Sequence, residues 1–128
     1  MQTKTLEELL VEANDLIKRL SYDESVDLIN NTQTVIIDVR EESEVYNLGL
    51  IKNAVHIPRG LIEFKLSPNS TNNPVLIEDN TNILVYCAGG YRSALAAKTL
   101  LDLGFKNVYN LGGFKEWVES GGEIQANI

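Results

Sequence analysis

Short apolar runs rich in β-branched residues alternate with helical stretches along most of this chain. A nearly continuous apolar run such as VIIDV is typical of a strand that is covered on both faces. Because strands that alternate with helices need crossover connections, we expect parallel strands with helices on both faces of the sheet. The sequence therefore predicts an α/β fold of three layers, α/β/α, around a central, mainly parallel sheet of about four to five strands. The expected strands are 35–39, 54–57, 83–86 and 107–111, and the expected helices between them are 42–47, 61–66, 92–103 and 114–120.

The start of the chain has the pattern of an amphipathic helix that packs on the domain or on a partner. Its apolar residues at helical spacing are Leu6, Leu9, Leu10, Ala13 and Ile17. Ser21 and Glu24 fit a capping box, which predicts a second helix that ends near residue 29. We interpret 1–20 as a helical extension and 21–128 as a single globular domain, with one long irregular connection at 67–81.

Charge and composition exclude several classes of function. The chain has 128 residues with 18 acidic and 11 basic side chains, a net charge of -7, which opposes binding to a nucleic-acid backbone. No stretch approaches the roughly 20 apolar residues of a membrane span, and the start lacks a basic leader, so we expect a soluble, cytoplasmic protein. One cysteine and one histidine cannot form a disulfide or a cysteine-based zinc site. We expect no metal and no cofactor, and a small anionic ligand would need a local positive pocket.

Cys87, the only cysteine, directly follows the expected strand 83–86. In parallel α/β sheets, ligands bind beyond the carboxyl ends of the strands, where loops lead into helices. Gly89 and Gly90 permit backbone angles that turn successive N–H groups inward, and the helix that follows starts near Arg92. Such surroundings can lower the pKa of a cysteine from about 8.5 into the range ~3.5–7.5, and the arginine adds a planar set of donors for an oxyanion.

A free cysteine at the end of a core strand is often only a small buried hydrophobic residue. The strand end, the cysteine, the paired glycines, the arginine and the helix start all fall within a few residues here, and this coincidence favours a catalytic thiol. Because amides and the helix dipole stabilise the thiolate, no general base is required.

Three motifs in order resemble those of rhodanese-like sulfurtransferases. CAGGYRSALAA resembles their active-site loop, VIIDVREESEVYNLGLIKNAVHIPRG their opening signature, and GFKNVYNLGGFKEWVESGG their closing signature. The resemblance runs from about 21 to 122 and implies that Cys87 is a nucleophile that becomes a persulfide. It also implies that Arg92 helps to bind the oxyanion end of the donor. The substrate-binding cradle would consist of Ala88, Gly89, Gly90, Tyr91, Arg92 and Ser93.

By this resemblance, the activity is transfer of a sulfane sulfur from thiosulfate or a similar donor to cyanide or a thiol, and a protein is a further candidate acceptor. Four residues separate Cys87 from Arg92, whereas phosphatases with a related loop have one more, so the smaller ring disfavours phosphate. The loop also lacks the Cys-Gly-Ser/Thr-Gly-Val pattern associated with mercaptopyruvate. The alternative is a non-catalytic or sulfur-carrier module that acts by partner binding, with the acidic N-terminal helix as its docking surface.

Further side chains have two readings each. Arg59, which follows a proline at the mouth of a strand, is either a second anion contact or a surface arginine. Asp38 and Arg40 either reach the active site from a neighbouring loop or make structural hydrogen bonds and an ion pair. We favour the structural role, with Glu44, one helical turn on, as a candidate partner of Arg40. Tyr91 either shapes the entrance to the loop or is an exposed residue without a role.

Two more features are expected to be structural. His56, within the strand 54–57, is interpreted as a half-buried side chain with its hydrogen bonds satisfied rather than as an acid or base. Phe114 and Trp117 lie on one face of the last helix and are expected to pack in the core.

Overall fold

Four parallel strands form the central sheet of the computed structural model, which describes residues 2–126. Their spatial order is β3-β1-β4-β5, so the two longest strands lie side by side. The strands are β1 (Thr34–Asp38), β3 (Val55–His56), β4 (Asn82–Cys87) and β5 (Val108–Gly113). Because all four are parallel, their carboxyl ends meet at one edge of the sheet.

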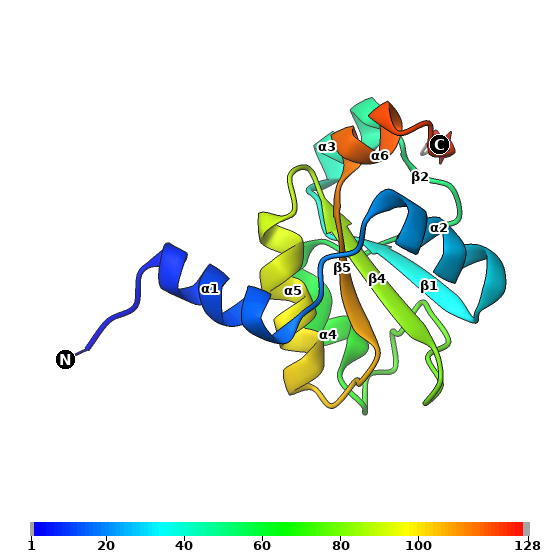
Figure 1. The fold of residues 1–128 in the computed structure, drawn as a ribbon. Helices are drawn as coiled ribbons and strands as arrows, with labels where there is room; N and C mark the ends of the chain where they lie inside the picture. Colours follow the sequence, from blue (N-terminus) through cyan, green and yellow to red (C-terminus); the bar gives the residue numbers. More distant parts are fainter. Residues whose placement is uncertain (1, 127–128) are drawn as a thin grey trace.

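Helices cover both faces of this sheet, so the predicted three-layer α/β/α fold is confirmed (Figure 1). One face carries α1 (Leu6–Leu16), α4 (Ile62–Leu66) with the short 3-10 turn η1 (Arg59–Leu61) before it, and α5 (Tyr91–Asp102). The other face carries α2 (Tyr22–Asn31), α3 (Glu42–Leu48) and α6 (Phe114–Glu119). Phe114 and Trp117 pack in the core of this second face, as predicted. Within residues 2–126, no helix combines the length and the apolar character needed to cross a membrane.

A small antiparallel pair of strands was not expected from the sequence. β2 (Leu50–Ile51) pairs with β6 (Ile124–Gln125) and ties the end of the chain to the segment after α3. Each strand has only two residues, which is too short to produce a recognisable alternation of apolar and polar side chains.

Alternation along β4 decides which face each side chain joins. Ile83, Val85 and Cys87 belong to the core under α5, whereas Leu84 and Tyr86 belong to the core under α2 and α6. The thiol of Cys87 therefore lies on the side of the sheet that α5 covers, directly below the amino end of that helix.

The N-terminal segment is only partly attached to the domain. The first turns of α1 project away from the sheet (Figure 1), and Leu6 is 57% exposed there. Farther along, Ala13 and Ile17 are buried against the face that α5 covers. The backbone then runs beside β5: Leu20 N–H donates to the Asn110 carbonyl at 2.9 Å, and Asn110 N–H donates to the Lys18 carbonyl at 3.0 Å.

A buried ion pair lies at the carboxyl end of β1. Arg40 Nη2 is 2.7 Å from Asp38 Oδ2, and the two side chains are 1% and 0% exposed. The same nitrogen donates to the Gly49 carbonyl at 2.6 Å, and the guanidinium lies 4.2 Å from the centre of the Phe114 ring. The expected pairing of Arg40 with Glu44 is wrong, because Arg40 precedes α3 and its side chain turns back to the strand end.

His56 supports the same region as a half-buried side chain, in line with the expectation from the sequence. Its Nε2 lies 2.7 Å from the carbonyl oxygen of Arg40, which joins the end of β3 to the end of β1. The backbone of Arg40 and its side chain are thus both fixed at the edge of the sheet where the strands end.

We predict that Arg40→Leu lowers the free energy of unfolding in urea by about 3–5 kcal/mol, because it leaves the buried carboxylate of Asp38 without its cation. Lys98→Ala is the matched control, since it removes a cation that pairs with Asp102 at 3.2 Å on the surface of α5. The control should cost no more than about 1 kcal/mol. An equal loss for the two variants would contradict the structural weight given to the buried pair.

Candidate active site

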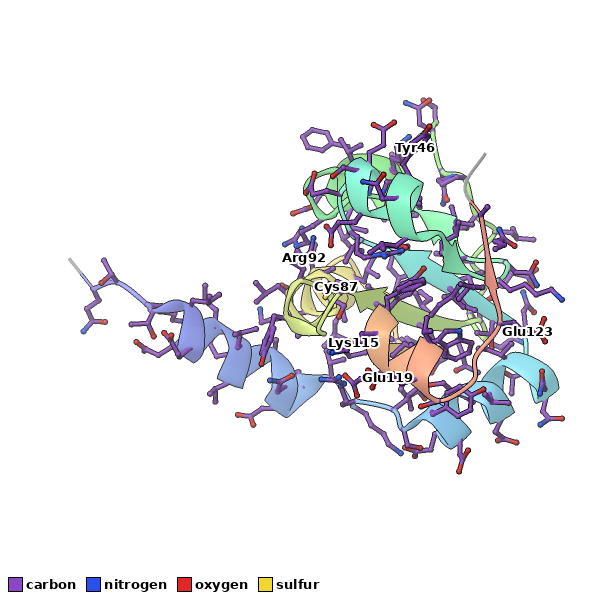
Figure 2. All side chains as sticks on the ribbon, turned by 90° about the horizontal axis from the view of Figure 1, so that it is seen from above. Tyr46, Cys87, Arg92, Lys115, Glu119 and Glu123 are labelled. Carbon is purple, nitrogen blue, oxygen red and sulfur yellow. The ribbon has the colours of Figure 1, made fainter. Side chains whose placement is uncertain are left out.

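Cys87 is the last residue of β4 and lies where the strands of the parallel sheet end. Seen from above in Figure 2, it lies between α3 and α6, with Arg92 close by. The loop 88–90 carries the chain from the strand to the first residue of α5, Tyr91. The structure therefore places the thiol at the carboxyl edge of the sheet and the amino end of a helix, as the sequence indicated.

Hydrogen-bond donors surround the sulfur of Cys87, which is 1% exposed. Gly90 N–H donates to Sγ at 3.0 Å, and the Ser93 hydroxyl lies 3.5 Å from it. Burial alone raises the pKa of the Cys87 thiol, but the Ser93 hydroxyl and the backbone N–H groups of Ser93, Gly90 and Gly89 outweigh burial, so the pKa lies below its ordinary value. The arrangement favours a thiolate, or another sulfur anion in the same place.

Asn110 holds this loop in place, and the sequence analysis did not identify it. Its side-chain NH₂ donates to the Gly90 carbonyl at 3.0 Å, and its Oδ1 accepts from the Ser93 hydroxyl at 2.7 Å and from Gly112 N–H at 2.9 Å. The register between β4 and β5 shifts by one residue just here, with Val85 opposite Asn110 and Tyr86 opposite Gly112. Such a bulge redirects a side chain. A polar residue inside the apolar run VYNL was the available signal.

The Ser93 hydroxyl links Asn110 to the sulfur and has one proton to donate. When Cys87 is a thiol, its S–H can donate to Ser93, whose own proton goes to Asn110. When Cys87 is a thiolate, the Ser93 proton can turn to the sulfur, while Asn110 keeps the Gly112 N–H as a donor. Both charge states of the sulfur are thus satisfied without movement of the backbone.

Arg92 is held by Glu44 of α3. Its Nη1 donates to Glu44 Oε1 at 2.6 Å and its Nη2 to Oε2 at 3.0 Å, a bidentate pair across the mouth of the loop. The hydrogen bond from Arg92 is the main cause that lowers the pKa of Glu44, to about 2. Glu44 in turn is the main cause that raises the pKa of Arg92, to which the nearby Cys87 also contributes.

Arg19, from the N-terminal segment, lies on the other side of the loop. A Cβ added to Gly90 would come within 2.8 Å of its Nη1, and one added to Gly112 within 2.7 Å of its Nη2. Both glycines have positive φ, 98° and 108°, so only glycine suits either position. Arg19 Nη2 also pairs with Glu116 Oε1 of α6 at 2.7 Å. Lone exposed arginines are common, so this contact could not be anticipated from the sequence.

The other predicted site residues divide into two groups. Ala88 and Gly89 are exposed at the loop surface, and the ring of Tyr91, which is 69% exposed, lies beside Gly89 and flanks the entrance. Arg59 instead donates to Thr99 Oγ1 at 3.0 Å and pairs with Glu63. Thr99 lies about 10 Å beyond Arg92 along α5, given a rise of about 1.5 Å per residue, so the structure directs Arg59 away from the loop.

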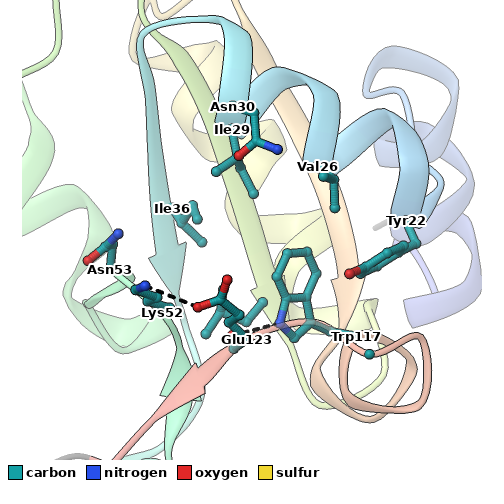
Figure 3. Close-up of a pocket in the computed structure, with 11 residues that line it drawn as sticks. Tyr22, Val26, Ile29, Asn30, Ile36, Lys52, Asn53, Trp117 and Glu123 are labelled. Carbon is teal, nitrogen blue, oxygen red and sulfur yellow. Dashed lines mark hydrogen bonds and ion pairs between the residues drawn. The ribbon is translucent and has the colours of Figure 1, made fainter.

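A cavity of about 260 Å³ lies on the opposite face of the sheet, between α2, α6 and the β2–β6 pair (Figure 3). Tyr22 and Trp117 line it with ring centres 5.1 Å apart, and Lys52 pairs with Glu123 at 3.0 Å on its rim. No residue of the Cys87 loop lines this cavity. Among residues 2–126, no three His, Cys, Asp or Glu side chains gather in a way that could hold a metal ion.

We predict that Ser93→Ala raises the pKa of Cys87, because it removes a donor to the sulfur anion while the burial remains. Alkylation of Cys87 by iodoacetamide, followed against pH by intact mass, should then reach half of its maximal rate at a higher pH than in the wild type. Ser25→Ala is the control: Ser25 is also fully buried, but its hydroxyl bonds to the Ser21 carbonyl within α2. An unchanged profile for Ser93→Ala would show that the hydroxyl does not stabilise the thiolate.

Comparison with known proteins agrees with this geometry. The family model of the rhodanese-like domain matches residues 21–120. The thiosulfate sulfurtransferase GlpE of Coxiella burnetii is 33% identical over 103 residues, which cover 80% of this chain and 88% of that protein. A tRNA uridine(34) hydroxylase of Prochlorococcus marinus is 33% identical over 105 residues, or 77% of this chain, but the chain spans only 34% of that protein's length.

One solved structure, of a protein of unknown function from Rhodopseudomonas palustris that is called a possible tyrosine phosphatase, is 35% identical to this chain. It superposes with a TM-score of 0.86 over 98% of this chain and 97% of that one. The span matched by the family model contains β4, the Cys87 loop, Arg92 and the strand that carries Asn110. By its sequence, its parallel sheet and the position of its Cys87 loop, the chain belongs to the rhodanese-like domain family.

Proposed function

We propose that this protein is a sulfurtransferase that carries a sulfane sulfur on Cys87 as a persulfide. The observation that carries the proposal is the set of donors around the sulfur: the N–H groups of Gly89, Gly90 and Ser93 and the Ser93 hydroxyl, which together keep the pKa of the thiol low despite burial. These donors stabilise negative charge at this position with fixed dipoles, so a thiolate can form without a metal or a general base.

In the first step, the Cys87 thiolate attacks the outer sulfur of a donor such as thiosulfate. The bond between the two donor sulfurs breaks, its electron pair leaves with sulfite, and the enzyme keeps a Cys–S–S⁻ group. The outer sulfur of this persulfide is anionic, as the thiolate was. The loop amides of Ala88 to Ser93 form the cradle in which we place it, with Arg92 near the end of the donor that carries oxygen.

In the second step, a thiophilic acceptor, cyanide or a thiol, attacks the outer sulfur of the persulfide. The bond between that sulfur and Cys87 Sγ breaks, the electron pair returns to Cys87, and the thiolate is regenerated. The two steps balance without an external oxidant or reductant, so no cofactor is needed.

Because the reaction needs a free thiol, we place the protein in the reducing cytoplasm.

A carrier module that delivers sulfur to a partner protein is a second candidate function. The observation that favours it is the exposed part of α1, where Leu6, Leu9 and Val11 are accessible to a partner. A carrier would form the persulfide but would turn over with cyanide only slowly, whereas an enzyme completes both steps.

The direct measurement is intact mass after incubation with thiosulfate. We predict a gain of one sulfur atom on the wild type, removal of that sulfur by cyanide with release of thiocyanate, and no gain on Cys87→Ser. Cys87→Ser should keep its free energy of unfolding within about 1 kcal/mol, because the change alters one buried atom.

Hydrolysis of p-nitrophenyl phosphate serves as the control for phosphatase chemistry. The loop places four residues between Cys87 and Arg92, and we expect no Cys87-dependent hydrolysis. Phosphate release that depends on Cys87, together with no sulfur adduct, would overturn the proposed function.

A further inference from the structure

The cation at the mouth of the loop is already neutralised. Both terminal nitrogens of Arg92 bind the two oxygens of Glu44, at 2.6 and 3.0 Å. Glu44 is itself fixed, because its Oε1 also accepts from Glu41 N–H at 3.0 Å at the start of α3. With a pKa of about 2, Glu44 stays ionised throughout the pH range in which a thiolate reacts.

Two other arginines do not compensate. Arg19, on the other side of the loop, pairs with Glu116 at 2.7 Å. Arg59 of η1 lies against Thr99, away from the loop, and pairs with Glu63 at 3.2 Å. The whole chain carries a net charge of -7, so its long-range field repels anions rather than attracting them. Among residues 2–126, the groups that hydrogen-bond the sulfur are the Gly90 N–H and the Ser93 hydroxyl, and the arginines on either side of the loop, Arg19 and Arg92, are each paired with a carboxylate.

The two ends of a sulfur donor would meet different electrostatic surroundings in this arrangement. The sulfane sulfur meets N–H donors, whereas the distal end meets an arginine whose charge is balanced by a carboxylate at hydrogen-bond distance. A dianion such as thiosulfate would be attracted by Arg92 and repelled by Glu44, whose oxygens lie only 2.6 and 3.0 Å from the Arg92 nitrogens. A donor with an organic group in place of one anionic oxygen meets a smaller repulsion and can use the exposed ring of Tyr91.

We propose that Glu44 is a specificity-determining residue that disfavours dianionic donors and makes this site selective for organic sulfane donors with a single negative charge. The inference rests on the proposed function. The step is Cys–S⁻ attacking the outer sulfur of R–SO₂–S⁻: the sulfur–sulfur bond breaks, its electron pair leaves with the sulfinate R–SO₂⁻, and Cys–S–S⁻ remains.

The test compares thiosulfate with methanethiosulfonate, which presents the same outer sulfur and one charge fewer. Formation of the Cys87 persulfide is followed by intact mass, and the readout is the ratio of the two second-order rate constants. A ratio removes any effect of a variant on the reactivity of the thiolate itself. In the wild type, methanethiosulfonate should react faster.

Glu44→Gln keeps an oxygen that accepts from Glu41 N–H and Arg92 but removes the charge. It should raise the thiosulfate-to-methanethiosulfonate ratio by about tenfold or more, because one charge close to the donor is removed from a partly desolvated site. Glu42→Gln is the matched control, because it removes the same charge from the exposed first turn of α3; it should change the ratio less than about twofold.

Arg92→Ala should change the thiosulfate-to-methanethiosulfonate ratio in the opposite direction, and the double variant completes a double-mutant cycle. Arg92→Ala leaves Glu44 without its cation and should lower the ratio, whereas Glu44→Gln with Arg92→Ala restores a neutral mouth and should return the ratio to within about threefold of the wild type. An unchanged ratio in Glu44→Gln, or an equal rise in Glu42→Gln, overturns the role of Glu44 and leaves the proposed function standing. Sulfur uptake from neither donor by the wild type overturns both.

Discussion

The side-chain amide of Asn110 fixes the Cys87 loop with both its NH₂ group and its oxygen. The donors around the thiol depend on these hydrogen bonds. Its NH₂ group fixes the Gly90 carbonyl, so the N–H of the same residue is aimed at the sulfur. Its oxygen fixes the Ser93 hydroxyl beside that sulfur. The side chain reaches the loop because β5 bulges at this position. The bulge in β5 thus positions the side chain that orders the donors around the Cys87 sulfur.

Two bidentate arginine–carboxylate pairs have different roles because they differ in exposure. Asp38 and Arg40 are sealed in the core, where their main effect is on stability: removal of one partner leaves a buried charge. Glu44 and Arg92 are only partly buried, at the mouth of the loop, where their main effect is on what can approach Cys87. The same pairing chemistry therefore serves the fold in one place and selects among ligands in the other.

The regular elements and the reactive loop could be predicted from sequence because their signals are local. Apolar periodicity located the four strands of the sheet, and the position of Cys87 between a strand and a helix start follows from them. Structural hydrogen bonds and an ion pair were expected of Asp38 and Arg40, and the two pair with each other. The partner of Arg92 could not be predicted, because it depends on how the start of α5 meets α3 in space. Spacing along the chain suggested an ion pair between Arg40 and Glu44. The actual partner of Glu44 is Arg92, which is 48 residues away in sequence.

Asn110 and Arg19 illustrate the same limit. A bulge depends on the register between two strands, and register is a property of the assembled sheet. The contact of Arg19 with Gly90 and Gly112 requires the N-terminal segment to run beside β5, which neither amphipathicity nor capping residues indicate.

The position of Arg19 shows that residues before the family match also contact the Cys87 loop. The family pattern begins at residue 21, just after Arg19, whose guanidinium covers Gly90 of the Cys87 loop and Gly112 of β5, and just after the backbone that pairs with β5. A recognisable domain and a complete reactive loop therefore have different starting points in this chain. In this chain, a single side chain, that of Arg19, joins the segment that leads into the family domain to the loop that carries Cys87.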